Sequence, residues 1–376
     1  MQRCDVLVVG GGPAGSSCAW ALRRQGLDVR VLDRARFPRH KVCAGWVTPG
    51  LVDALGLDLD EYGRGRTLQP IRGFRTGVLG GPLVETSYPG PVSYGILRSE
   101  FDAYLLRRSG APVTEGAGVT SLRREGDEWV VNDAFRAPML VGAGGHFCPV
   151  ARWLGARRTD DVLVAAQEVE FRMDAAQRGQ CRVERDMPEL YFCEDLKGYG
   201  WIVRKDDVLN VGFGRADARG FPEKARAFAA SLAATGRVPA GTPARWLGHA
   251  YLLYDARRPR LVDDGALLVG DAAGLAYAQS GEGIRPAVES GLLAAGVIGA
   301  AGGDYRRERL LSYRERLLAR FGAPPRHGAL PLPAGWLSAI GRRLLATSWF
   351  TRRVVIEGWF LHSRQGPLTR EAGEGR

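Results

Sequence analysis

The chain has 376 residues, of which 45% are hydrophobic and 25% are charged, and its formal net charge is +11. This is the composition of an ordinary globular protein, long enough for two domains that each have a core. No apolar run reaches the roughly 18 residues that a membrane-spanning helix needs. The six cysteines show neither a zinc signature nor a disulfide framework, so we expect no bound metal.

The basic residues are scattered along the chain rather than gathered in one tract. A basic balance favours anionic partners in general, but this distribution does not predict a nucleic-acid partner. The first residues lead directly into an apolar strand, without the longer apolar stretch and cleavage site of a signal peptide. We therefore expect a cytoplasmic protein.

The first predicted unit is strand, glycine turn, helix and strand. A buried parallel strand at Asp5–Val9 precedes a G-x-G-x-x-G turn, a helix at Ser16–Gln25 and a strand at Val29–Leu32. The glycines allow a tight turn, close approach of a pyrophosphate and close helix–strand contact, and the helix amino terminus attracts phosphate. An acidic residue after the second strand can bind an adenosine ribose. The predicted dinucleotide contacts are Gly10, Gly12, Pro13, Ala14, Gly15, Asp33 and Arg34.

Two candidate residues follow in the next segments. Cys43 comes after the basic residues His40 and Lys41, and nearby cations favour a reactive thiolate. It is a candidate proton donor or redox-active thiol, or else a small apolar filler in a buried loop. Arg98 begins a helical segment with an apolar face, where it can contact the cofactor or simply face solvent.

The middle of the chain reads as a mixed sheet with covering helices. Tyr199 and Trp201 alternate on one strand, so their side chains share a face and form either a substrate wall or an aromatic core stripe. The predicted strands are Val162–Arg172, Glu189–Phe192, Gly200–Val203 and Val208–Gly214, and a helix is predicted at Phe221–Thr235.

A second glycine-rich turn follows a short apolar strand at Gly265–Val269. Gly270 and Asp271 lie in this turn, and Gly281-Glu282-Gly283-Ile284 opens a long, apolar helix. A further helix is predicted at Leu310–Phe321. The region Trp336–His362 reads as one or two basic amphipathic helices interrupted near Ser348, which either pack on the body or cover a substrate tunnel or acidic membrane.

The run Gly270-Asp271-Ala272-Ala273-Gly274 resembles the second FAD motif of the flavoprotein superfamily that includes para-hydroxybenzoate hydroxylase. Within it, the chain is most similar to the geranylgeranyl reductase-like branch. The similarity rests on this segment and on three others, which are Phe37–Gly45, Leu97–Leu105 and Gly198–Lys205. It departs from the branch at Ala44, at Val203-Arg204 and at Gly144, which takes the place of an FAD-serving Asp in the hydroxylases.

The resemblance implies roles for particular residues. Asp271 would bond the ribityl chain of FAD, and Tyr199 and Trp201 would line the substrate cavity. Cys43 would lie near the flavin and the substrate double bond. The remaining implied cofactor contacts are Lys41, Cys43, Ala44, Arg98, Gly142, Gly145, Gly270, Gly281, Glu282, Gly283 and Ile284.

The predicted fold class is α/β: a Rossmann-type FAD-binding domain (residues 1–70, 95–160 and 258–300) interleaved with an α+β substrate domain (71–94 and 161–257). A helical region follows at 301–363, and we expect 364–376 to be disordered.

The resemblance implies an FAD-dependent oxidoreductase that reduces a carbon–carbon double bond of a hydrophobic, isoprenoid-like substrate. NAD(P)H or a reduced electron-carrier protein would supply electrons, and the terminal helices could contact a membrane peripherally. Two alternatives stay open: a monooxygenase or halogenase acting through a C4a-hydroperoxide, and a non-catalytic flavoprotein redox sensor.

Overall fold

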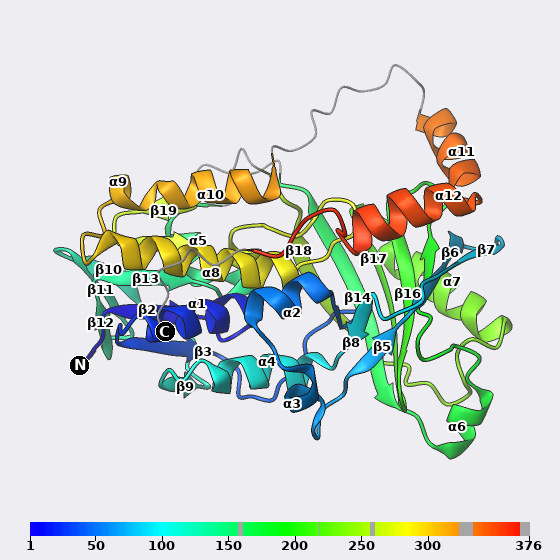
Figure 1. Ribbon diagram of the computed structural model, residues 1–376, viewed down its shortest axis with the longest axis horizontal. Helices are drawn as coiled ribbons and strands as arrows, with labels where there is room; N and C mark the ends of the chain where they lie inside the picture. Colours follow the sequence, from blue (N-terminus) through cyan, green and yellow to red (C-terminus); the bar gives the residue numbers. More distant parts are fainter. Residues whose placement is uncertain (157–160, 218, 256–259, 323–333, 369–376) are drawn as a thin grey trace.

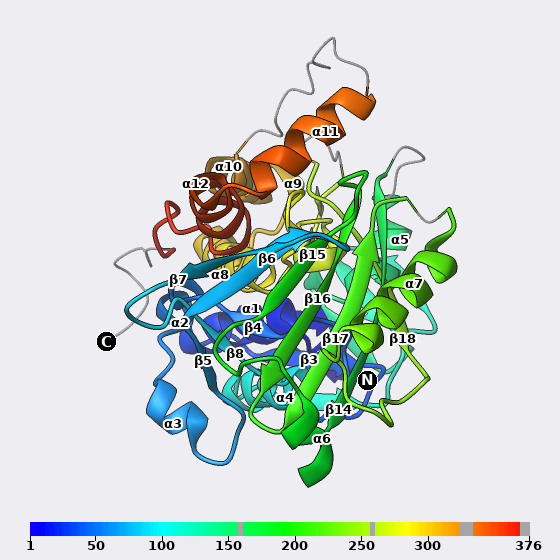
Figure 2. The ribbon, with the colours of Figure 1, turned by 90° about the vertical axis from the view of Figure 1, so that its right-hand side faces the viewer.

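The computed structural model describes residues 1–156, 161–217, 219–255, 260–322 and 334–368, and it confirms the predicted α/β fold class. Two large sheets lie toward opposite ends of the long axis, with helices over both (Figure 1). The C-terminal helices within residues 334–360 lie above the seven-stranded sheet, and the helix at Ala334–Leu345 projects away from it (Figure 2).

The six-stranded sheet carries the glycine-rich turn after its strand at Val6–Val9. This valine-rich central strand is fully buried and pairs in parallel on both sides, with Val8 opposite both Val31 and Val141. Only the edge strand β19 pairs in antiparallel fashion. The strands in spatial order are β19 (Val262–Asp263), β20 (Ala266–Leu268), β13 (Met139–Gly142), β2 (Val6–Val9), β3 (Val29–Asp33) and β9 (Val113–Glu115).

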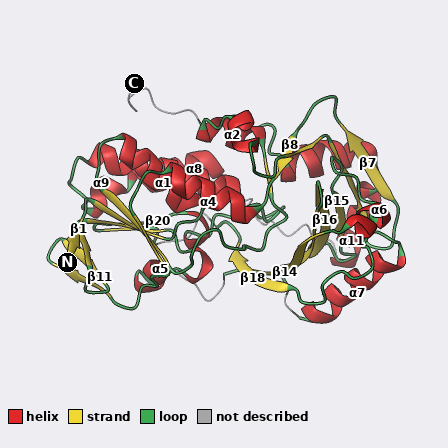
Figure 3. Ribbon diagram, turned by 90° about the horizontal axis from the view of Figure 1, so that it is seen from below, coloured by secondary structure: helices red, strands yellow, loops and turns green. Residues whose placement is uncertain are grey.

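Helices α1 (Pro13–Arg24) and α8 (Ile284–Ala301) lie side by side on one face of this sheet (Figure 3). They pack closely because Gly291 has no side chain: a Cβ there would lie 2.3 Å from the carbonyl oxygen of Ala14. By length and composition α8 could cross a membrane, but 72% of it is buried inside the protein. Helix α4 (Arg98–Arg108) packs beside α1.

The seven-stranded sheet is built from residues 73–87 and 163–252 and is mostly antiparallel. Helix α7 (Phe221–Ala234) covers one face, where the Phe228 ring occupies the space over Gly200. The strands in order are β18 (Leu247–Leu252), β14 (Leu163–Arg172), β17 (Val208–Arg215), β16 (Gly198–Lys205), β15 (Glu189–Phe192), β6 (Gly73–Val78) and β7 (Leu83–Ser87).

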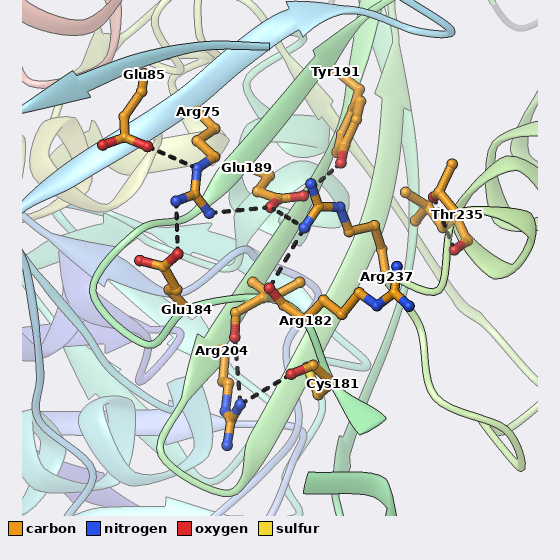
Figure 4. A network of polar contacts seen from close by, with 12 residues as sticks. Arg75, Glu85, Cys181, Arg182, Glu184, Glu189, Tyr191, Arg204, Thr235 and Arg237 are labelled. Atoms are coloured by element: carbon orange, nitrogen blue, oxygen red, sulfur yellow. Dashed lines mark hydrogen bonds and ion pairs between the residues drawn. The ribbon is translucent and has the colours of Figure 1, made fainter. Parts of the chain in front are cut away.

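A polar network on the α7 side of this sheet ties three segments together (Figure 4). The buried carboxylate of Glu189 lies 3.8 Å from Arg75 on β6 and 3.3 Å from Arg237, which follows α7. The Tyr191 hydroxyl donates to the same carboxylate at 2.5 Å. A buried charge is tolerated only when it is paired, so this network holds the outer strands and α7 in one arrangement.

Two small sheets and several short helices complete the body. The three-stranded sheet is β4 (Trp46–Val47), β8 (Ser93–Gly95) and β5 (Gln69–Ile71); the four-stranded sheet is β1 (Gln2–Arg3), β12 (Phe135–Ala137), β11 (Glu128–Val131) and β10 (Leu122–Glu125). The short helices are α2 (Pro49–Leu55), α3 (Leu59–Gly63), α5 (Pro149–Trp153), α6 (Ala175–Gln180), η1 (Gly145–Phe147) and η2 (Gly270–Ala272).

The C-terminal region contains interrupted helices, as the sequence suggests. The helix predicted at Leu310–Phe321 is two helices, α9 (Arg307–Leu310) and α10 (Ser312–Phe321). After residues 323–333, α11 (Ala334–Leu345) ends before Ser348, where α12 (Ser348–Phe350) leads into the π-helix η3 (Thr351–Phe360). The apolar side of η3 packs on the seven-stranded sheet through Val355, Ile356 and Phe360.

Residues 364–368 correct the expectation that the chain is disordered from 364 onward. The carbonyl oxygens of Gln365 and Gly366 accept hydrogen bonds from Arg285, and the Gln365 side chain bonds Tyr277 and the Arg320 carbonyl. These buried partners hold a segment whose own composition is that of a disordered tail. Residues 369–376 lie outside the described residues.

Candidate active site

One large cavity lies between the two sheets and has a volume of about 1030 Å³. This is above the usual range for sites of drug-sized ligands. The cavity extends from the loop between β2 and α1, past residues 39–46, to the aromatic residues of β16 and η3. It therefore joins the predicted nucleotide site to the predicted substrate strand.

Glycine shapes the nucleotide end. Gly10 has a φ of +115°, and a Cβ there would lie 2.3 Å from the Ala143 carbonyl oxygen. Gly15 brings α1 against the turn, because its Cβ would lie 1.9 Å from the Gly10 carbonyl oxygen. Asp33 accepts a hydrogen bond from the Gly11 N–H at 2.7 Å and from the Ala35 N–H at 2.8 Å. The turn presents free N–H groups at the start of α1, which suits the pyrophosphate of a dinucleotide.

Most of the residues predicted from sequence line this cavity. Those that do are Gly10, Gly12, Pro13, Ala14, Asp33, Arg34, Lys41, Cys43, Ala44, Arg98, Gly145, Tyr199, Trp201, Asp271, Gly281, Glu282, Gly283 and Ile284. Gly15, Gly142 and Gly270 lie behind the wall: a Cβ on Gly142 would be 2.6 Å from Leu268, and one on Gly270 would be 2.9 Å from Ala14. These three glycines act on the cavity through close packing.

Two arginines share one buried carboxylate beside the glycine turn. Arg98 makes two 2.9 Å hydrogen bonds to Asp102, and Arg39 lies 3.0 Å from the same carboxylate. The Arg39 guanidinium also lies over Gly12, 3.4 Å from the position of a Cβ. Two cations on one anion leave a net positive charge there, which suits a phosphate-bearing cofactor.

A second charged cluster surrounds Asp271 at the centre of the cavity. The Lys41 ammonium hydrogen-bonds His249 and lies 3.9 Å from the Asp271 carboxylate, and His249 is 3.8 Å from it. Burial lowers the pKa of Lys41 to about 8 even though Asp271 opposes the shift. Burial alone would raise the pKa of Asp271, but His249 and Lys41 lower it to about 2. Asp271 is therefore an ionised hydrogen-bond acceptor, as bonding of a ribityl hydroxyl requires.

The backbone of Cys43 is held at both ends by side chains of the seven-stranded sheet. Its N–H donates to Glu168 at 2.7 Å, and its carbonyl oxygen accepts from Asn210 at 3.1 Å. The Trp201 indole N–H donates to Asn210 at 2.7 Å. The thiol of Cys43 thus sits in a fixed loop beside Trp201.

Aromatic rings form the other end of the cavity. Tyr199 and Trp201 lie 5.9 Å apart, which confirms that they share a face of β16, and Phe360 of η3 packs 5.4 Å from Tyr199. Trp46 lies 6.1 Å from Phe360 and also lines the cavity. Such a chamber favours an apolar ligand.

The start of α8 brings Glu282 into the cavity wall. Burial raises the pKa of Glu282 to about 8, although Arg285 lowers it. A Cβ on Gly281 would lie 2.2 Å from the Tyr251 hydroxyl oxygen, and one on Gly283 would lie 3.2 Å from Asp271. Glycine is therefore needed at position 281, where φ is +69°, whereas an added Cβ at position 283 would only be slightly tight.

Several cavity residues escaped prediction from the sequence. Arg39 and His40 could have been predicted as cavity residues because they directly precede Lys41 in the sequence. No local pattern marks His249, Tyr251 or Phe360, which come from an edge strand and from a helix more than 100 residues later. The acidic residues of β14, buried Glu168 and partly buried Glu170, do carry a signal, because alternate acidic residues on a mostly apolar strand are unusual.

Comparisons with known proteins agree with this geometry. The family model described as FAD binding domain matches residues 3–322. The chain is 30% identical to the chloroplastic geranylgeranyl diphosphate reductase of Oryza sativa subsp. japonica, over 85% of this chain and 72% of that protein. It is 27% identical to the digeranylgeranylglycerophospholipid reductase of Methanocaldococcus jannaschii, over 83% and 81% of the two chains.

Solved structures share the fold. A geranylgeranyl bacteriochlorophyll reductase-like protein from Thermoplasma acidophilum matches with a TM-score of 0.74 and 21% identity, over 95% of this chain and 92% of that one. The halogenase PltM in complex with phloroglucinol and FAD matches with a TM-score of 0.68 and 18% identity, over 85% and 74%. The glycine turn, the cations beside it and the ionised Asp271 fit FAD. The chain therefore belongs to the FAD-binding-domain family, in its geranylgeranyl reductase-like branch, and is an FAD-dependent oxidoreductase.

Proposed function

We propose that the protein reduces a carbon–carbon double bond in a hydrophobic, isoprenoid-like substrate. The observation that carries the proposal is a single cavity whose one end has a dinucleotide-binding turn and whose other end is aromatic and apolar. The names of the relatives, which are reductases of geranylgeranyl compounds, support the same substrate class.

The residues of the chain would divide the work as follows. The Gly10–Gly15 turn, Arg39 and Asp33 bind the dinucleotide, and Asp271 with Lys41 and His249 orients its central part. FAD, when bound, supplies hydride chemistry. Tyr199, Trp201 and Phe360 bind the apolar substrate and exclude water.

Reduction of a double bond also needs a proton. The Cys43 thiol lines the cavity in a loop whose backbone is held by Glu168 and Asn210. We assign Cys43 as the group that delivers this proton to the substrate carbon. NAD(P)H or a reduced carrier protein would be the electron source.

The test is anaerobic mixing of chemically reduced, FAD-loaded protein with a long-chain isoprenoid such as geranylgeranyl diphosphate. We expect the flavin absorbance to return to the oxidised form and the product to gain two hydrogen atoms, as read by mass spectrometry. Cys43→Ala should slow this step by about 100- to 10,000-fold. In a parallel aerobic reaction, incorporation of an oxygen atom or halide into an aromatic compound would instead support the monooxygenase or halogenase alternative.

We also propose that helix α11 rests on an acidic membrane surface. Ile340 and Leu344 are 45% and 39% exposed on this helix, and Trp349 after it is 69% exposed. The exposed Arg342 and Arg343 lie between Ile340 and Leu344 in the sequence. An exposed apolar stripe flanked by arginines is the pattern of an interfacial helix.

A further inference from the structure

A buried carboxyl group lies directly behind the cavity wall, and its environment is unusual. The Glu168 side chain is fully buried on β14. Its Oε2 atom accepts hydrogen bonds from the Cys43 N–H at 2.7 Å and from Asn210 at 3.3 Å. Its Oε1 atom is buried and has no hydrogen-bond partner. A buried oxygen without a hydrogen bond carries a free-energy cost and therefore needs a specific explanation.

The group that faces Oε1 is His40. The Nε2 atom of His40 lies 3.4 Å from Oε1, and the imidazole lines the cavity, where 37% of its side chain is exposed. His40 therefore connects the buried oxygen to the space that holds cofactor and substrate.

The other charged groups around Glu168 and His40 come from β14, from β16, from the loop before Cys43 and from α4. Glu170 lies two residues along β14, on the same face, and is neutralised by Lys205 of β16 at 2.9 Å. Asn210 of β17 bridges both glutamates, with contacts of 3.3 Å and 3.0 Å. Arg39 and Arg98, from the loop before Cys43 and from α4, act on His40 as nearby cations.

These surroundings favour one proton on the pair. Burial, and then Glu170, raise the pKa of Glu168 to about 8, although Lys205 opposes them. Burial lowers the pKa of His40, while Glu170 opposes that shift. At neutral pH the arrangement that satisfies both groups is a neutral Glu168 whose Oε1–H donates to a neutral His40.

We propose that Glu168 and His40 form a proton-delivery pair, in which Glu168 stores one proton behind the wall and His40 passes it into the cavity. The inference rests on the proposed reduction and supplies its proton source. Cys43 gives its proton to the substrate carbon and is left as a thiolate. His40 then gives up a ring proton to that thiolate while its Nε2 takes the Oε1 proton of Glu168. The products are a neutral Cys43, a neutral His40 and a Glu168 carboxylate, so one proton has moved.

The carboxylate that remains is stabilised where it forms. It keeps the hydrogen bonds from the Cys43 N–H and from Asn210, and charge-assisted bonds of this kind are stronger than neutral ones. Solvent then restores the proton through His40, the partly exposed member of the pair. Glu168 is thus a positioning and storage residue, and His40, which lines the cavity together with Cys43, passes the proton on.

The first experiment needs no substrate. Infrared difference spectra of the FAD-loaded protein, recorded across the pKa of about 8, report the C=O stretch of protonated carboxyl groups. We expect the Glu168 band to disappear on the alkaline side in the wild type, to be missing in Glu168→Gln, and to shift in His40→Gln, because the hydrogen-bond acceptor then changes from an imidazole nitrogen to an amide oxygen. The pKa of Glu282 is also raised to about 8, so Glu282→Gln is used to identify the band of that carboxyl group. Glu189→Gln is the matched control for neutralising a buried glutamate of the same sheet.

The outcomes separate the inference from the proposed function. If Glu168→Gln retains every band, or if His40→Gln leaves the Glu168 band unmoved, the pair is overturned and the reductase proposal stands. In the olefin reaction, the wild-type rate should decline as the pH rises through 8, where Glu168 loses its proton. Glu168→Gln should lower the rate by at least about tenfold below pH 8 and should not show this decline. If no isoprenoid reoxidises the reduced wild type, the proposed function fails while the infrared result still decides the pair.

Discussion

The two ends of the cavity are built by different means. At the nucleotide end, the main chain itself is the binding surface, and the four glycines of residues 10–15 shape it. At the substrate end, the surface is made of side chains from β14, β16, β18 and η3, which are separated by up to 200 residues in the chain. The first end depends on what a short segment can do by itself. The second depends on the register of the strands and on which helix covers the face of the seven-stranded sheet.

The difference predicts how each end responds to change. A backbone surface tolerates no added atoms, because the atoms that would have to move are held by the sheet. A surface of side chains can lose one member and keep its fold, at a cost set by the cavity left behind.

The largest expected effect is therefore at Gly15. In Gly15→Val the new side chain would overlap the Gly10 carbonyl oxygen, which lies 1.9 Å from the position of the Cβ. We expect no folded protein that retains FAD, as measured by gel filtration with flavin absorbance. Gly179→Val is the control, because nothing lies within 4 Å of a Cβ there. Retention of FAD by Gly15→Val would contradict our account of the turn.

The next effect is at the substrate end. Phe360 is 1% exposed and packs on Trp46, Phe192 and Tyr199. Phe360→Ala should lower the free energy of unfolding by about 3–5 kcal/mol and leave FAD binding nearly unchanged. Denaturant unfolding and flavin titration measure the two quantities. A matching loss of FAD affinity would mean that the two ends are not separable.

The third prediction concerns pH. The folded pKa of Glu168 is raised from 4.5 to about 8. Its favourable contribution to stability is thus complete below about pH 4.5 and is lost as the pH rises through 8. Relative to Glu168→Gln, the wild type should lose a few degrees of Tm between the acidic and alkaline ends of this range. Parallel Tm curves for the two proteins would show that Glu168 does not carry the buried proton.

The smallest effect is expected outside the cavity, on α11. Replacing Arg342 and Arg343 by Gln should weaken binding to vesicles that contain anionic lipid by about 1 kcal/mol for each charge. Binding to neutral vesicles and flavin reduction should not change. Sedimentation with vesicles measures the binding, and equal sedimentation of wild type and variant would remove the membrane proposal.

The features that could be predicted from the sequence are mostly those that depend on a short segment, as at the nucleotide end of the cavity. The strand, turn, helix and strand from Asp5 to Asp33, the second turn at Asp271 and the pairing of Tyr199 with Trp201 follow from local patterns, and the structure has them. The departure at Ala44 is harmless in the fold because the position that requires glycine is Gly45, with a φ of +70° and Lys205 2.4 Å from the site of a Cβ. Residues 364–368 were misjudged because their partners, Arg285 and Arg320, are on other helices.

From its order of residue types alone, the chain specifies an FAD-type fold. Glycine spacing, apolar periodicity and an acid at the end of a strand act within a few residues of each other and need no distant partner. Three features arise only when β14, β17 and η3 pack against the loop at 39–46. They are the contact of Glu168 with His40, the two hydrogen bonds that hold the backbone of Cys43, and the packing of Phe360 at the aromatic end of the cavity. Each of these contacts joins residues far apart in sequence, and burial gives a carboxyl or an imidazole its unusual proton affinity only once the sheet has closed around it.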